Sequence, residues 1–98
     1  MPNYLVESYL ADTPGAVERS RERARALADA GEGVRYVRTT FLPGDETILH
    51  VFEAPSPEAL SRAVSEAALP YGRIVEAVEK AAQTTEGDQE PANEGGSS

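Results

Sequence analysis

The sequence predicts a single α+β domain of the ferredoxin-like kind, with two helices on one face of an antiparallel sheet. Four short segments are rich in residues that favour β-strands, and two segments carry apolar residues at helical spacing. Proline and glycine separate these segments, and their order is β-α-β-β-α-β. A chain of 98 residues suits one small domain, which we expect over residues 1–80.

The first expected strand covers residues 3–10, where β-favouring residues stand between turn residues. The first helix is expected to begin at Pro14, because Thr13 can cap it and proline is tolerated at the first helical position. Gly31 or Gly33 is expected to end the helix, since glycine readily adopts a left-handed conformation. The apolar stripe of this helix consists of Val17, Ser20, Ala24, Leu27 and Ala28.

The middle of the chain predicts a β-hairpin. Strands are expected over about 34–42 and 46–54, and the Pro-Gly-Asp run between them is a strong turn signal. Ser56 and Pro57 then predict the start of the second helix, as its cap and its first residue. The segment 73–79 carries β-branched residues in partial alternation, which favours a last strand over a short helix.

The composition changes after residue 80. Residues 81–98 are dominated by Gly, Glu, Gln, Thr, Asn, Pro and Ser. Such a segment buries too little apolar surface to offset its ordering entropy, so we expect a disordered acidic tail. The formal net charge of the whole chain is −8, which argues against nucleic acid or an anionic membrane as a partner.

Cysteine is absent from the chain, and histidine occurs once. A disulfide, a thiolate metal site and a cysteine nucleophile are therefore excluded. One histidine without any cysteine also leaves few residues from which a catalytic triad could be built. The first residues lack the charged and apolar regions of a signal peptide, and no stretch is apolar enough for a membrane-spanning helix. We expect a cytoplasmic protein.

A sheet with helices on one side leaves its other face open to solvent, a partner or a ligand. Because side chains alternate along a strand, we expect the helices to cover the more aliphatic sets. The covered set is then Val6, Val37, Phe41, Leu49 and Val51. The open set is Glu7, Tyr9, Tyr36, Arg38, His50 and Phe52. A β-bulge would reverse part of this assignment.

The open set is the candidate site. His50 is the predicted metal ligand with Glu7 beside it, or a general acid/base, because imidazole titrates near neutrality. The alternative is a half-buried strand histidine that is hydrogen-bonded to a neighbour such as Glu7. Arg38 would hold an anionic ligand through its planar fork, or would pair with Glu7 instead. The predicted ligand-binding residues are Glu7, Tyr9, Tyr36, Arg38 and Phe52, in a pocket between two packed sheets.

The first helix also carries four arginines at every second position. They are Arg19, Arg21, Arg23 and Arg25. The interleaved Glu18 and Glu22 lie three or four residues from several of these arginines, within reach of ion pairs. We expect Glu18 to pair with Arg21, and Glu22 to pair with Arg19 and Arg25, on a solvated helix face.

Four segments carry a family resemblance, namely MPNYLVE (1–7), GVRYVR (33–38), ETILHVFEAP (46–55) and LPYGRIVE (69–76). In this order they resemble a family of small bacterial proteins of unknown function that includes a nickel-binding protein. The resemblance covers about residues 1–79. It implies a ferredoxin-like domain that assembles as a dimeric α+β barrel, with nickel or another divalent metal as a ligand.

The chain departs from that family at two positions. Arg38 stands where many relatives have a histidine, and His50 stands where many have a cysteine. A guanidinium group cannot give up its proton to bind a metal. In this chain, His50 together with Glu7 would have to replace the missing ligands.

The expected function is that of a homodimeric module that binds a small molecule or a divalent metal between its two sheets, without catalysis. The alternative is a cofactor-free isomerase or monooxygenase of the dimeric α+β barrel type. A strongly perturbed His50 beside an apolar cavity large enough for a substrate would favour that alternative. A third possibility is a structural or regulatory protein that uses its acidic tail, and deletion of residues 81–98 would test it.

Overall fold

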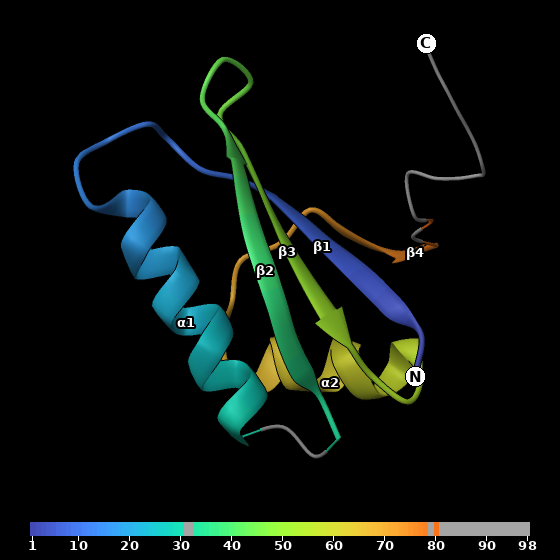
Figure 1. Ribbon diagram of the computed structural model, residues 1–98. Helices are drawn as coiled ribbons and strands as arrows, with labels where there is room; N and C mark the ends of the chain where they lie inside the picture. Colours follow the sequence, from blue (N-terminus) through green and yellow to red (C-terminus); the bar gives the residue numbers. More distant parts are fainter. Residues whose placement is uncertain (31–32, 79, 81–98) are drawn as a thin grey trace, which may run out of the picture.

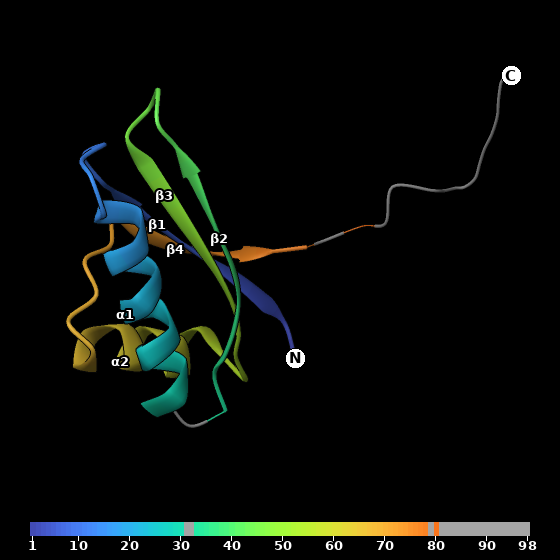
Figure 2. The same cartoon turned by 60° about the vertical axis from the view of Figure 1, so that its left-hand side comes forward.

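The computed structural model describes residues 1–30, 33–78 and 80. Its elements are β1 (Asn3–Tyr9), α1 (Ala16–Ala30), β2 (Arg35–Leu42), β3 (Thr47–Glu53), α2 (Pro57–Glu66) and β4 (Arg73–Ala77). The strands form one antiparallel sheet in the order β2-β3-β1-β4. Both helices lie on the same side of this sheet (Figures 1 and 2). The predicted ferredoxin-like fold is confirmed, while Gly31 and the expected tail, residues 81–98, lie outside the described residues.

Helix α1 begins two residues later than predicted. Gly15 has a φ of +77°, in the left-handed region, so the chain turns there and does not yet form a helix. The carbonyl of Gly15 accepts the first helical bond, from the N–H of Arg19 at 3.0 Å, which makes Gly15 the cap in place of Thr13. A side chain at Gly15 would also meet Arg19, since an added Cβ would lie 2.8 Å from its Nη1 atom.

Helix α2 begins as predicted. Ser56 has an extended backbone, and its Oγ accepts a hydrogen bond of 3.1 Å from the N–H of Ala59. Pro57 occupies the first helical turn, where its missing N–H leaves no helical bond unmade.

Replacement of Ser56 by alanine is expected to lower the free energy of unfolding by about 1 kcal/mol, because a helix cap is lost. Ser65→Ala is a matched control, because the hydroxyl of this exposed serine caps nothing. Urea unfolding of both variants measures the difference. Equal losses in the two variants would contradict a capping role for Ser56.

The core lies between the helices and the covered face of the sheet. Its largest fully buried side chains are Phe52, Leu27, Ile48, Leu60, His50, Val6 and Val64. The register explains this set, because directly paired residues point to the same face of a sheet. Val6 pairs with His50, and Tyr4 pairs with Phe52, so β1 and β3 present these side chains to the helices together.

The predicted assignment of the two faces is wrong on β3 and on part of β2. His50 and Phe52 face the helices, and Leu49 and Val51 face the opposite side. On β3 both sets contain large apolar residues, so alternation alone could not choose between them. On β2 a bulge between Tyr36 and Arg38 shifts the register, so that Tyr36 is paired with the covered Phe52.

Candidate functional site

The uncovered face of the sheet has an apolar centre and a charged rim. One row across it pairs Arg38 with Val51, Val51 with Leu5, and Leu5 with Val75. Leu49 lies in the next row. Val51 is only 5% exposed although both helices lie on the other side. We call Leu5, Leu49, Val51 and Val75 the apolar strip.

Ion pairs flank the apolar strip at both ends. Glu7 Oε1 lies 2.6 Å from Arg73 Nε, and Glu53 Oε1 lies 2.9 Å from Arg35 Nη2. Glu7 is therefore paired with Arg73, on β4. Tyr9 also faces this side, and its hydroxyl donates to Glu46 Oε1 at 3.1 Å, which raises the pKa of Tyr9.

His50 lies on the covered face, at the centre of a chain of hydroxyl groups. Its Nε2 atom is 2.9 Å from Ser20 Oγ on α1, and its Nδ1 atom is 2.8 Å from Thr39 Oγ1 on β2. Thr39 Oγ1 is in turn 2.6 Å from the hydroxyl of Tyr36. Burial lowers the pKa of His50 to about 4, so the imidazole is neutral near pH 7.

The structure does not bring the predicted site residues together. Glu7, Tyr9 and Arg38 belong to the uncovered face, whereas His50, with Tyr36 and Phe52, points toward the helices. The prediction of a metal site that joins His50 to Glu7 within one chain is therefore wrong, because their side chains leave the sheet on opposite faces. His50 is a hydrogen-bonded strand histidine, as the alternative had it, but it is fully buried and its partners are the hydroxyls of Ser20 and Thr39 instead of Glu7.

Sequence reasoning missed Ser20 and Thr39. One signal for Ser20 was present, because it is the polar member of an otherwise apolar helical stripe. A polar residue on a core-facing stripe needs a partner inside the protein. That partner, His50, lies 30 residues further along the chain.

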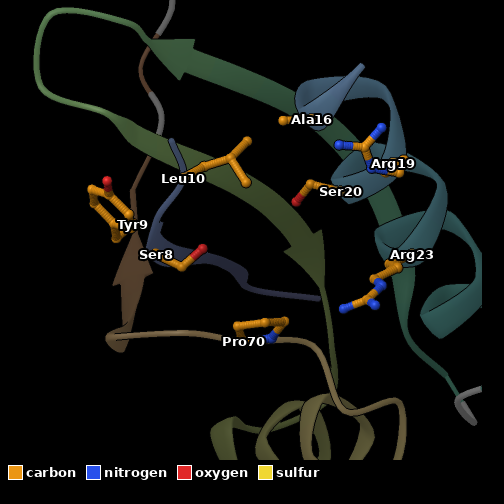
Figure 3. Close-up of a pocket in the computed structure, with 8 residues that line it drawn as sticks. All are labelled: Ser8, Tyr9, Leu10, Ala16, Arg19, Ser20, Arg23 and Pro70. Atoms are coloured by element: carbon orange, nitrogen blue, oxygen red, sulfur yellow. The ribbon is translucent and has the colours of Figure 1, made fainter. Parts of the chain in front are cut away.

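A cavity of about 220 Å³ opens on the helix side of the sheet, next to this hydroxyl chain. The residues that line it are Ser8, Tyr9, Leu10, Ala16, Arg19, Ser20, Arg23 and Pro70. In Figure 3 the hydroxyls of Ser8 and Ser20 and the guanidinium of Arg23 point into this space. We call it the α1 cavity. Its lining comes from β1, α1 and the segment before β4, so no short motif could predict it.

The described residues do not fit a nickel site within one chain. They contain no group of three or more His, Cys, Asp or Glu side chains that could hold a metal ion. The imidazole of His50, which is the preferred kind of ligand for nickel, has both nitrogens engaged with hydroxyls. Across the described part of the chain, no helix combines the length and the apolar character needed to cross a membrane.

Comparisons with known proteins agree with this fold. The crystal structure of SCO4226 from Streptomyces coelicolor A3(2) matches with a TM-score of 0.66 and 20% sequence identity, over 81% of this chain and 99% of that chain. No curated protein matches the chain. A family model described as "Nickel responsive protein SCO4226-like" matches residues 4–77. Since this match spans all four strands and both helices, the chain belongs to the SCO4226-like family of nickel-responsive proteins.

Proposed function

We propose that this protein is a small binding module that acts as a homodimer, with two copies packed through their uncovered sheet faces. The observation that carries the proposal is the apolar strip, which lies inside a rim of ion pairs on a face that neither helix covers. The resemblance to a dimeric α+β barrel family supports the same arrangement.

The surface chemistry suits a two-fold symmetric contact. Around a two-fold axis the same patch of both copies meets, so the apolar strip of one copy can contact that of the other while the charged rim stays exposed to solvent. At each end of the apolar strip a carboxylate is paired with a guanidinium group, Glu7 with Arg73 and Glu53 with Arg35. Neither ion pair therefore brings an uncompensated charge against the partner copy. A domain of about 80 residues has a thin core, and burial of this face would add to its stability.

Substitution of Val75 by arginine is expected to convert the dimer to a monomer. Val75 is 38% exposed on the edge strand β4, so the substitution should leave the fold intact while it brings cations into the contact. Ala26→Arg, on an exposed position of α1, is the matched control and should remain dimeric. Light scattering measures the mass, and circular dichroism checks the fold. A monomeric unmodified protein at working concentration would overturn the proposal.

The description of the family makes a divalent metal the first ligand to test. On the uncovered face, Glu7 and Glu53 offer carboxylate oxygens, whereas His50 lies on the other face. Carboxylates alone hold nickel less well than imidazoles do, so binding at the sheet interface should be weak.

Calorimetric titration with nickel tests this placement. We expect the same weak binding in the unmodified protein and in His50→Gln, and a loss of that binding in Glu7→Gln. Binding that disappears in His50→Gln and persists in Glu7→Gln would move the metal to the helix side of the sheet and overturn the placement.

The environment of His50 favours binding over catalysis. Its pKa is lowered to about 4, both ring nitrogens are engaged, and the side chain is 1% exposed. The neighbouring α1 cavity is lined by two arginines and two serines as well as by apolar residues. Neither feature supplies a free base beside an apolar substrate pocket.

A further inference from the structure

The α1 cavity concentrates positive charge in an acidic protein. Arg19 and Arg23 lie one helical turn apart and both line the cavity. The predicted ion pair between Glu18 and Arg21 is present at 3.7 Å. Glu22 was expected to pair with Arg19 and Arg25, but it forms no ion pair with any described residue.

Neither cavity arginine is neutralised within the described part of the chain. Arg19 donates from Nη1 to the carbonyl of Pro14 at 3.5 Å, and Arg23 has no carboxylate partner among the described residues. Like charges four residues apart on a helix repel each other. A bound anion would relieve this repulsion and would use the planar donor forks of the two guanidinium groups.

The remaining lining adds hydrogen-bond donors and a small apolar wall. Ser8 on β1 and Ser20 on α1 direct their hydroxyls into the cavity (Figure 3). Leu10, Ala16 and Pro70 line the rest of the space. None of the eight lining residues is acidic.

The hydroxyl chain behind the cavity can supply Ser20 as a donor. A hydroxyl has one proton to donate, and a neutral imidazole donates through one nitrogen and accepts through the other. In one consistent arrangement Tyr36 donates to Thr39, and Thr39 donates to His50 Nδ1. The Nε2–H of the ring then donates to Ser20 Oγ, which leaves the proton of Ser20 for a molecule in the cavity.

We propose that the α1 cavity binds the oxyanion group of a small organic acid or phosphate ester, through its two guanidinium groups and its two serine hydroxyls. His50 is a positioning residue, because it fixes the hydroxyl of Ser20 as a donor. The site opens on the helix side of the sheet and the apolar strip lies on the other side, so the site stays accessible in the proposed dimer and does not depend on it.

Titrations followed by ¹H–¹⁵N NMR test the site with defined probes. Inorganic phosphate, phenyl phosphate and benzoate are the anions, and uncharged benzamide is the control for apolar contact alone. We expect saturable shifts at α1 and β1 for the anions only, weaker at high salt. Tighter binding of phenyl phosphate than of benzoate identifies a phosphate ester as the ligand class, and the reverse order identifies a carboxylate.

Matched variants assign the donors. Arg23→Gln is expected to weaken anion binding roughly ten- to hundredfold, because a charge-assisted hydrogen bond is lost. Arg21→Gln removes an arginine from the same helix outside the cavity and should leave the affinity unchanged.

The tautomer of His50 gives a readout that a merely structural role would not change. The ring ¹⁵N shifts of the complex should show the proton on Nε2, and Ser20→Ala should weaken binding and abolish the effect of the anion on these shifts. The proposal is overturned if no anion binds, if benzamide binds as well as benzoate, or if Arg21→Gln weakens binding as much as Arg23→Gln.

Discussion

Acidification from about pH 7.5 to about pH 4 is expected to lower the free energy of unfolding by about 3 kcal/mol more in this protein than in its His50→Gln variant. The cause is the burial of His50, which lowers its pKa from 6.5 to about 4. Between these two values the unfolded chain binds a proton on His50 and the folded chain does not. Stability from this group is therefore complete above about pH 6.5 and falls as the pH drops toward 4.

Urea unfolding at several pH values across this range measures the effect. Only the dependence on pH is compared, because His50→Gln also changes the contacts with Ser20 and Thr39 and so lowers the stability at every pH. The carboxylates titrate in both proteins, so their contribution cancels. Parallel stability curves for the two proteins would show that His50 is protonated in the folded state as readily as in the unfolded chain.

Truncation of Phe52 to alanine is expected to lower the free energy of unfolding by about 3–5 kcal/mol. Phe52 is completely buried, and its ring meets the ring of Tyr36 edge to face with 6.0 Å between centroids. A small domain has a total stability of about 5–15 kcal/mol, so this single truncation should remove a large share of it.

Phe41→Ala is the matched control for Phe52→Ala. Phe41 lies on the same face of the sheet, but on the edge strand β2 and only half buried, so its truncation leaves a smaller cavity. Thermal unfolding followed by circular dichroism compares the two variants. An equal loss in both would contradict the position of Phe52 at the centre of the core.

The order of the elements was predictable because its signals are local. The cap at Ser56, the turn after Leu42 and the glycine near the end of α1 each act within a few residues. Local signals could not predict which side of β3 faces the helices. Its two sides carry Ile48 and Phe52 against Leu49 and Val51, and only the packing of the whole sheet decides which side meets the helices.

The candidate site was predictable only in its most unusual residue. His50 stands out as the single histidine, but its environment depends on Ser20 and Thr39, which come from a helix and a neighbouring strand. Burial by these elements makes the ring neutral and inaccessible, which the strand pattern alone did not indicate. The α1 cavity was missed because its arginines, considered along the helix only, had glutamates within reach.

The bulge in β2 makes the hydroxyl chain possible. In a regular strand, residues separated by an odd number of positions point in opposite directions, so Tyr36 and Thr39 could not meet. The extra residue, Val37, restores the match, and their oxygens come within 2.6 Å. Deletion of Val37 would leave Tyr36 and Thr39 two positions apart in a regular strand, with both side chains still on the covered face, so the link between tyrosine and imidazole survives loss of the bulge only when this residue is lost with it.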